Sequence, residues 1–257
     1  MVQPELSFVI PAYNEERFIE DTLGKLDLVI KDRMLQYEVV VVDDGSQDKT
    51  YSRAKKYAKK NAHVRVLRFL KNRGKGYAVR TGSMEALGDI VVFVDSDMEI
   101  DLRTIIEYVE ALDHGDIVIA SKWHPESNVR IPLVRKILSR SFNVFVKILT
   151  NASLKDTQVG LKVMKRSAVD TIFPRLAVKR YAFDVELLAV ANLYGLRVVE
   201  MPVTLKLDAP FKLKEALRMF IDLLGIAYRL KIIHWYQREV PVKDSLQNLV
   251  SAVLRET

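Results

Sequence analysis

Two carboxylates one residue apart, Asp95 and Asp97, directly follow an apolar run at residues 90–94. A continuous apolar run of this kind is typical of a buried strand in a parallel sheet, which presents its carboxyl-end residues to a ligand-binding crevice. Two carboxylates there repel each other unless a cation joins them. Their hard oxygens suit Mg²⁺ or Mn²⁺, and such a metal usually also holds substrate phosphates. The pair therefore indicates a metal-bound nucleotide substrate, although Asp-x-Asp also occurs in ordinary strand-to-loop turns.

Two earlier apolar runs also end in polar residues that precede a helical pattern. The run at 6–10 leads into Pro11-Ala12-Tyr13-Asn14-Glu15, and the run at 39–42 leads into Asp43-Asp44-Gly45-Ser46-Gln47-Asp48. Three strands would therefore present polar side chains at one edge of a sheet. For Asp44-Gly45 taken alone, a simple turn is the alternative.

A basic loop, Asn72-Arg73-Gly74-Lys75-Gly76, precedes another helical pattern. Glycines allow a close backbone approach and the N-terminus of a helix favours phosphate, so Lys75 is a candidate phosphate ligand. The loop matches neither a Walker nor a Rossmann fingerprint, and a solvated connector is the alternative.

With these stretches in this order, the chain resembles the family 2 glycosyltransferases of the GT-A fold. Residues 9–15, 41–48, 72–76 and 95–97 carry the resemblance, and ordered agreement over roughly the first 100 residues is more specific than any one motif. The resemblance implies that the donor nucleotide is held by Pro11, Tyr13, Glu15, Asp43, Asp44, Lys75 and Asp95. A carboxylate such as Asp44 can accept a ring N–H from uracil or from guanine, so this residue does not decide between the two bases.

The resemblance also implies a metal site at Asp95 and Asp97, which would act in catalysis by supporting the departing diphosphate. Related polyprenyl-phosphate sugar synthases often carry a polar metal-facing residue two positions further on, which is Glu99 here. Glu99 is thus a candidate third ligand, and an exposed loop acid is the alternative.

Motifs in the second half resemble the dolichyl-phosphate hexosyltransferases. The matching stretches are 120–122, 138–143, 155–162 and 181–187; the Asp-Thr-Gln-x-Gly-x-Lys run is closest to the glucosyl branch, and the mannosyl branch is near. The resemblance implies that the acceptor phosphate is held by Lys122, Arg140, Asn143 and Lys162, with Arg140 matching a phosphate-binding arginine of the family. At Lys122 the family usually has arginine, and lysine keeps the charge but loses the bidentate fork. For Arg140 the alternative is a solvated charge on a helix.

Two predicted helices, 132–149 and 212–236, have one cationic polar face and one apolar face. Such helices can lie in a membrane interface, with Phe145, Phe220 or Trp235 as aromatic anchors. The sequence has no uncharged apolar stretch of about 18 residues or more, so it predicts no transmembrane helix, and contact with the membrane would be peripheral. Packing of both helices on the sheet is the alternative.

Strands and helices alternate along the first half of the chain. Strands are predicted near 6–10, 37–43, 63–68, 89–95, 116–121, 160–165 and 197–203. Helices are predicted near 15–30, 49–61, 75–87, 101–112, 132–149, 182–194 and 212–236, with Asp48 and Asp101 as N-caps. This order predicts an α/β fold with a mostly parallel central sheet flanked by helices. The expected divisions are a catalytic domain at 1–210, with a nucleotide-sugar half at 1–121 and an acceptor half at 122–210, an interfacial helix at 211–239 and a charged tail at 240–257.

The chain of 257 residues carries 40 Lys and Arg against 33 Asp and Glu, a net charge of +7. A basic balance favours anionic partners such as nucleotides or an acidic membrane surface, and no recognition motif supports nucleic acid. The sequence has no cysteine and no signal-peptide pattern at its start. These features fit a cytoplasmic protein, peripheral at the cytoplasmic face of a membrane.

Together these features predict a metal-dependent transfer of a hexose from UDP-glucose or GDP-mannose to a polyprenyl (dolichyl) phosphate, and the family resemblance implies inversion at the anomeric carbon. The acceptor phosphate is already anionic, so in-line placement and neutralisation of the diphosphate would suffice without a general base. A transferase acting on a sugar hydroxyl would need a base, for which Asp156 is the candidate. A phosphoreceiver domain would carry its acidic pair after the first strand, whereas Asp43 and Asp44 follow the second. Whether a separate membrane subunit takes part stays open.

Overall fold

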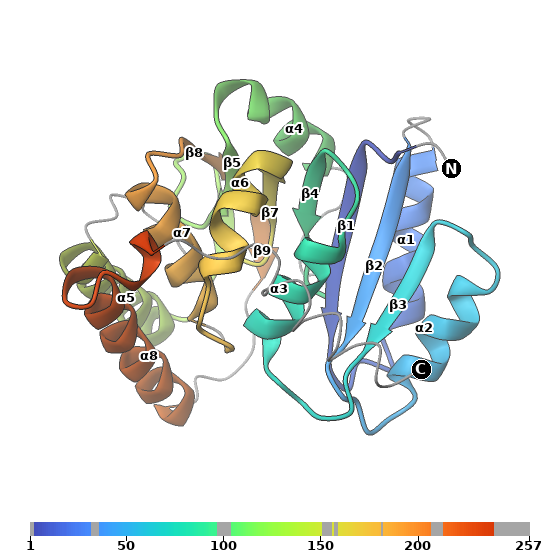
Figure 1. Ribbon diagram of the computed structural model, residues 1–257, viewed down its shortest axis with the longest axis horizontal. Coiled ribbons are helices and arrows are strands. Elements are labelled where there is room, and N and C mark those ends of the chain that lie inside the picture. The colour runs from blue at the N-terminus through green and yellow to red at the C-terminus, as the bar shows by residue number, and fades with distance from the viewer. Residues whose placement is uncertain are drawn as a thin grey trace.

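The computed structural model describes residues 3–31, 36–96, 104–150, 156, 159–180, 182–206 and 213–238. The strands of its central sheet are β1 (Leu6–Ala12), β2 (Tyr37–Asp43), β3 (Val64–Arg68), β4 (Ile90–Phe93), β5 (Ile117–Ser121), β7 (Lys162–Lys165) and β8 (Val198–Pro202). They lie in the order β3-β2-β1-β4-β7-β5-β8 (Figure 1). All neighbouring strands are parallel except that β7 runs antiparallel to both β4 and β5. The predicted mostly parallel sheet of a GT-A fold is confirmed.

Helices cover both faces of this sheet. One face carries α1 (Ile19–Lys31), α2 (Thr50–Ala58) and α4 (Ile105–Glu110), and the other carries α3 (Lys75–Glu85), α6 (Arg166–Ile172) and α7 (Phe183–Leu193). Successive side chains of a strand point to opposite faces, so Phe8 and Ile10 belong to the first core, whereas Val9 belongs to the second. The uninterrupted apolar runs of the sequence are therefore strands buried on both faces.

The two remaining long helices, α5 (Leu133–Thr150) and α8 (Leu213–Lys231), lie side by side at one end of the molecule (Figure 1). A small separate core joins them to α7 rather than to the sheet. Its members include Val146 of α5, Val185 and Ala189 of α7, and Leu223 and Ile226 of α8. None of the helices that the structure describes is both long and apolar enough to cross a membrane.

The strand order places a topological switch point between β1 and β4. The chain proceeds from β1 to β2 and β3 on one side and then crosses back to β4 on the other side of β1. In open α/β sheets, ligands bind outside the carboxyl ends of the strands at such a point. Tyr13 follows β1 there and Asp95 follows β4, so the strand order alone brings two predicted site residues to one crevice.

Several predicted boundaries were wrong. Two three-residue strands, β6 (Asn128–Arg130) and β9 (Thr204–Lys206), form a small second sheet that the sequence did not predict, and α6 was also missed. The last helix was predicted to reach residue 236, but α8 ends at Lys231, and the short 3-10 turn η4 (Trp235–Gln237) follows a left-handed His234 with φ 49°. Two further 3-10 turns are η2 (Ala111–His114) and η3 (Phe173–Arg175).

Asp48 and Asp101 were the predicted helix N-caps. Asp48 lies one position before the N-cap residue of α2, which is Lys49, yet its carboxylate still accepts the Thr50 backbone N–H at 2.9 Å. It therefore satisfies a free N–H of the first turn, as a cap would. Asp101 lies outside the described residues. The first helix was predicted from residue 15 and begins at Ile19, because residues 14–16 instead bond to the loop after β2.

Candidate active site

The loops after β1 and β2 hold each other in place. The Asn14 backbone N–H donates to Ser46 Oγ at 3.0 Å, and Asn14 Oδ1 accepts the Gln47 N–H at 2.9 Å. Asn14 has φ 58°, a left-handed conformation that asparagine tolerates better than most residues. The Glu15 N–H donates to Thr50 Oγ1 at 2.8 Å. The two loops are neighbours because β1 pairs with β2. Their hydrogen bonds join them into one rim at the carboxyl end of these strands.

The predicted base-binding residues lie along this rim. Pro11 is buried at the end of β1, Tyr13 is 42% exposed, and Glu15 is half-buried. Asp43 is fully buried, where Arg68 Nε lies 3.2 Å from its Oδ2. Burial raises the pKa of Asp43, and hydrogen bonds from Ser46 with the charge of Arg68 oppose that rise. Tyr13 therefore has an accessible ring, whereas Asp43 supports the strand end from inside.

Asp44 connects the rim to the basic loop before α3. One carboxylate oxygen accepts the Arg73 backbone N–H at 2.7 Å, and the other accepts the Gly74 N–H at 2.8 Å. Burial raises the pKa of the Asp44 carboxyl, although these two N–H bonds favour the charged form. The sequence suggested a base-binding role, and the structure assigns Asp44 a second one, which is to fix the basic loop.

The basic loop is also clasped from its other side by the segment that precedes α7. Gly74 has φ 98°, and a Cβ there would lie 2.3 Å from the Lys179 carbonyl oxygen. A Cβ on Gly76 would lie 2.6 Å from Phe183 Cβ. The Lys179 carbonyl accepts the Tyr77 N–H at 3.3 Å. Only glycine fits at these positions, which explains the spacing of the two glycines on either side of Lys75.

Lys75 opens α3 and reaches the carboxylate that follows β4. Its Nζ lies 2.6 Å from Asp95 Oδ1, with both side chains about one-quarter exposed, at 25% and 28%. A Cβ on Gly160 would lie 1.8 Å from the other oxygen of Asp95, so the loop before β7 must have glycine at this position. The Asp95 carboxylate thus lies between the ammonium of Lys75 and the backbone of Gly160, which has no side chain.

Of the three predicted metal ligands, Asp95 is the one that the described residues include. The ammonium of Lys75 lies 2.6 Å from its Oδ1, so this oxygen already faces a positive charge. Within the described part of the chain, no three acidic or histidine side chains converge on one point. Asp97 and Glu99, the other two predicted ligands, lie outside the described residues. Carboxylate oxygens are the ligands that Mg²⁺ and Mn²⁺ prefer.

Beneath this pair lies a second, fully buried ion pair. Lys162 Nζ is 2.6 Å from Asp184 Oδ1 and donates to the Val159 carbonyl at 2.8 Å. The ammonium groups of Lys75 and Lys162 lie 5.2 and 5.7 Å from the centre of the Phe93 ring. Burial raises the pKa of the Asp184 carboxyl, and the charges of Lys162 and Lys75 oppose that rise. The predicted phosphate ligand Lys162 is therefore an interior cation with its own carboxylate.

Lys122 is also committed to an acid. Asp156 accepts the Lys122 backbone N–H at 2.7 Å and its ammonium at 2.9 Å, and both side chains are buried. The Asp156 N–H in turn donates to Glu200 of β8 at 3.0 Å. Asp156, the candidate general base of the alternative reaction, is thus a buried partner of Lys122.

Arg140 is the predicted acceptor residue with an exposed side chain. It lies on α5, and its guanidinium is 4.9 Å from the centre of the Trp123 ring, beside Lys122 in sequence. Asn143 lies one turn further along α5 and is buried. The structure thus brings Arg140 and Lys122 to one area and places Lys162 in the layer below.

Three residues of this site were not singled out as site residues from the sequence. Gly160 and Asp184 both lie within stretches that carried the family resemblance, whereas Phe93 was seen only as part of the apolar run. For Gly160, the indication in the sequence was its position within residues 156–162, a stretch that carried the family resemblance. Nothing in the sequence indicated that Asp184 would pair with Lys162.

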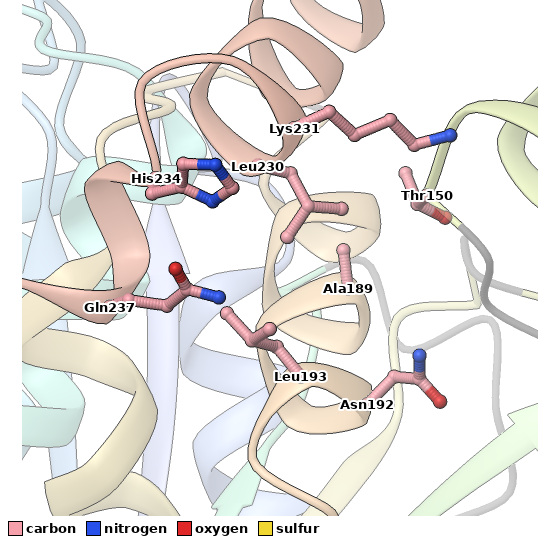
Figure 2. Close-up of a pocket in the computed structure, with 8 residues that line it drawn as sticks. All are labelled: Thr150, Ala189, Asn192, Leu193, Leu230, Lys231, His234 and Gln237. Carbon is pink, nitrogen blue, oxygen red and sulfur yellow. The ribbon is translucent and has the colours of Figure 1, made fainter.

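A cavity of about 470 Å³ lies elsewhere, near the ends of α5, α7 and α8 (Figure 2). Its lining residues are Thr150, Ala189, Asn192, Leu193, Leu230, Lys231, His234 and Gln237. The lining has no carboxylate and includes none of the predicted site residues. The chemistry indicated by the sequence therefore belongs to the edge of the sheet and not to this cavity.

Comparison with known proteins agrees with this geometry. The profile of glycosyl transferase family 2 matches residues 7–173. A dolichyl-phosphate beta-glucosyltransferase of Trichomonas vaginalis is 33% identical to this chain, and the match covers 93% of this chain and 76% of that protein. A dolichyl-phosphate beta-glucosyltransferase of Homo sapiens is 36% identical to this chain, and the match covers 77% of this chain and 66% of that protein.

Solved structures show the same fold. Glucosyl-3-phosphoglycerate synthase from Mycobacterium tuberculosis in complex with UDP superposes with a TM-score of 0.66, at 20% identity, over 87% of this chain and 80% of that chain. Its complex with Mn²⁺, UDP-glucose and phosphoglyceric acid gives a TM-score of 0.65 over the same shares, also at 20% identity. The family profile covers more than half of this sequence and ends beyond the strand that carries Lys162, so the chain belongs to glycosyltransferase family 2.

Proposed function

We propose that this chain transfers glucose from UDP-glucose to dolichyl phosphate or a similar polyprenyl phosphate, with inversion at the anomeric carbon. The observation that carries the proposal is the 33% identity, over 93% of the chain, to a dolichyl-phosphate beta-glucosyltransferase. A second support is the M. tuberculosis relative by fold, which has been crystallised with Mn²⁺ and UDP-glucose. These names favour UDP-glucose over GDP-mannose, the two donors that the sequence left open.

In this reaction an oxygen of the acceptor phosphate forms a bond to C1 of glucose. The bond between C1 and the β-phosphate oxygen of UDP breaks, and its electron pair leaves with UDP. No proton must be removed from the acceptor, since a phosphate monoester is anionic at neutral pH. The protein has to align the two phosphates on opposite sides of C1 and neutralise the charge that develops on the departing diphosphate.

On the donor side, Tyr13, Glu15 and the strand end at Pro11 and Asp43 would hold the base and ribose. Asp44 fixes the basic loop through the Arg73 and Gly74 N–H groups, and Lys75 of that loop would meet the diphosphate. A divalent Mg²⁺ or Mn²⁺ ion bound by Asp95 and Asp97, with Glu99 as a third ligand, would supply the positive charge that stabilises the leaving diphosphate.

On the acceptor side, Arg140 is the residue we assign to the lipid phosphate. Its side chain is exposed and its guanidinium lies 4.9 Å from the centre of the Trp123 ring, so its donors are available to a phosphate. Lys122 and Asn143 would line the same area. Lys162 lies in the layer below, where Asp184 pairs with its buried ammonium, so we assign it no direct contact with the phosphate.

The acceptor is a lipid, and the exposed apolar side chains of α5 and α8 give a surface on which to meet it. The exposed apolar residues include Val144, Phe145 and Ile148 on α5, Leu217, Ile221, Leu224 and Tyr228 on α8, and Ile232 and Trp235 just after α8. Exposed cations, Lys136, Arg140, Lys147 and Arg218, lie on the same two helices. This composition fits peripheral binding at the cytoplasmic face of an anionic membrane.

Transfer to a sugar hydroxyl is less well supported. That reaction needs a carboxylate free to take a proton. Its candidate, Asp156, is 1% exposed and accepts two hydrogen bonds from Lys122.

The deciding experiment supplies the purified chain with dolichyl phosphate, Mn²⁺ and either radiolabelled UDP-glucose or GDP-mannose. We expect label from UDP-glucose in the solvent-extracted lipid, and far less from GDP-mannose. Asp95→Asn and Asp97→Asn should each nearly abolish transfer while keeping the melting temperature. Equal use of both donors, or label only in water-soluble glycans, would contradict the proposal.

A further inference from the structure

We propose that Lys75 is an exchangeable counter-cation for Asp95. In the free enzyme its ammonium occupies the carboxylate oxygen that the divalent metal is to use. The nucleoside diphosphate then draws Lys75 away and delivers the metal in its place. This inference rests on the proposed function, because it concerns the order in which the donor and its metal bind.

Lys75 lies beside Asp95, where solvent and ligands can reach it. Its Nζ lies 2.6 Å from Asp95 Oδ1, and the pair is only about three-quarters buried, so solvent and ligand can reach both groups. A divalent ion on the same oxygen would lie within a few ångströms of the ammonium, and the two cations would repel each other. Lys75 and the metal therefore compete for Asp95.

The two carboxylate oxygens of Asp95 have different neighbours, Lys75 at Oδ1 and Gly160 at Oδ2. A Cβ on Gly160 would lie 1.8 Å from Asp95 Oδ2, so the backbone of Gly160 stands directly against that oxygen. Oδ1 is the oxygen that faces Lys75, and exchange of cations takes place there.

The other nearby lysine, Lys162, cannot replace Lys75 as the partner of Asp95. Lys162 is 1% exposed and lies 2.6 Å from Asp184, with a further bond to the Val159 carbonyl. When Lys75 leaves, Asp95 keeps its negative charge for the metal. The two ammonium groups against Phe93 thus have different tasks, one exchangeable and one fixed.

Lys75 can move toward a diphosphate bound at the N-terminus of α3. It is the first residue of α3, an eleven-residue helix, and it follows Gly74 with φ 98°. Free N–H groups at a helix N-terminus favour phosphate, so a diphosphate at this loop offers the ammonium a new anionic partner. The exchange leaves both cations paired: Lys75 with phosphate, and the metal with Asp95 and phosphate.

The test measures binding of Mn²⁺ itself, by loss of the electron paramagnetic resonance signal of the free ion. Wild type, Lys75→Met, Lys75→Gln and Lys71→Met are compared without nucleotide and with UDP. Lys71 is the matched control, since it is an exposed lysine of the same loop and its loss changes the net charge equally. Melting temperatures confirm that each variant is folded.

We expect Lys75→Met and Lys75→Gln to bind Mn²⁺ without nucleotide about tenfold more tightly than wild type, because a repelling charge beside the metal is gone. Lys71→Met should stay near wild type. UDP should tighten Mn²⁺ binding in wild type by a larger factor than in the Lys75 variants, since linkage between two ligands is reciprocal. Adding Asp95→Asn to Lys75→Met should remove the gain.

The outcomes separate this inference from the proposed function. If the Lys75 variants bind Mn²⁺ no more tightly than Lys71→Met, while UDP still promotes Mn²⁺ binding in wild type, the exchange is overturned and the metal-dependent function stands. If no variant binds Mn²⁺ even with UDP, both are overturned.

Discussion

Glu186 and Tyr236, which are 50 residues apart in the sequence, meet in the interior, where the tyrosine hydroxyl donates to Glu186 Oε1 at 2.5 Å. The other oxygen of Glu186 accepts the backbone N–H groups of Ala177 and Val178 at 3.0 and 2.8 Å. Arg229 of α8 donates to the same tyrosine oxygen at 2.9 Å. One carboxylate therefore ties α8 and the turn after it to the segment that clasps the basic loop.

Tyr236→Phe should lower the free energy of unfolding by about 1–3 kcal/mol, because it removes a buried hydrogen bond to Glu186 and leaves Arg229 with one acceptor fewer. Urea unfolding of the full chain measures the loss. Tyr228→Phe is the matched control, since Tyr228 is a 54% exposed tyrosine on the preceding helix, α8. An equal effect of the two substitutions would mean that the hydroxyl of Tyr236 carries no special stability.

Gly160→Ala should abolish productive binding of the donor with its metal. The new methyl group would stand 1.8 Å from Asp95 Oδ2, so either the carboxylate or the loop before β7 must move. We expect transfer to fall at least about tenfold and Mn²⁺ binding with UDP to weaken, since an ångström of misplacement at reacting groups is costly.

Gly24→Ala is the control for that substitution. Gly24 lies within α1 with no atom within 4 Å of an added Cβ, so alanine there should be neutral or stabilising by up to about 1 kcal/mol. Full activity of Gly160→Ala would show that the close approach to Asp95 does not matter for the reaction.

Some parts of this site could be predicted because they depend only on local sequence. Asp44 and Asp95 end apolar runs, and parallel strands bring their carboxyl ends to one edge. Lys75 could be placed there too, because it begins a helix after a glycine-containing loop. The strand at 160–165 was expected, but its direction was not. β7 runs antiparallel, and this alone brings its first residue, Lys162, to the active edge.

The buried pairings could not be predicted because they join residues far apart in the sequence. Lys122 meets Asp156, and Lys162 meets Asp184, only after β7 has inserted between β4 and β5. From the sequence, both lysines were predicted to bind phosphate, because the residue type gives the sign of the charge but not the carboxylate that pairs with it. β6 and β9 were missed because three residues are too few for a periodic pattern.

Affinity for UDP-glucose should fall as the pH is lowered, and the fall should begin at a higher pH than an ordinary aspartate would give. Burial raises the pKa of Asp44, and the nearby charge of Asp43 adds to this effect. An acid with a raised pKa takes up its proton earlier as the pH falls, and protonated Asp44 would hold the Arg73 and Gly74 N–H groups less strongly. Binding is therefore strongest above the raised pKa and weakens below it.

Calorimetric titration with UDP-glucose at a series of pH values measures this dependence, because its diphosphate does not titrate in the same range. Asp44→Asn should bind more weakly at neutral pH and show a flatter profile. A profile in Asp44→Asn as steep as that of wild type would assign the pH dependence to another group.

Arg140→Ala should impair use of the lipid phosphate far more than binding of UDP-glucose. Arg140 lies on α5 against Trp123, and none of the donor-side contacts described above involves it. We expect KM for dolichyl phosphate to rise at least about tenfold, as for loss of a charge-assisted bond, while the Kd for UDP-glucose stays unchanged. Arg140→Lys should recover only part of the loss, since lysine lacks the planar fork. Equal losses for both substrates would remove Arg140 from the acceptor site.

The exposed apolar side chains of α5 and α8 should bind anionic vesicles. Ile148→Asn combined with Ile221→Asn removes two aliphatic groups that are 62% and 58% exposed, so the fold should keep its stability. Burial of such side chains in lipid is favourable by about 1.5–3 kcal/mol each when complete, so vesicle affinity should drop by at least an order of magnitude. Leu70→Asn is the control, because Leu70 is 74% exposed but lies just after β3, outside both helices.

Sedimentation with phosphatidylserine-containing vesicles at low and high salt measures the effect. Wild type should sediment at low salt and be released in part at high salt, since cations beside the apolar surface attract anionic lipid. An equal loss for Leu70→Asn would mean that the contact is not specific to α5 and α8. Failure of wild type to bind vesicles, together with full activity on detergent-solubilised acceptor, would assign the anchor to a separate membrane subunit. The apolar side chains of α5 and α8 would then be the surface on which that subunit docks.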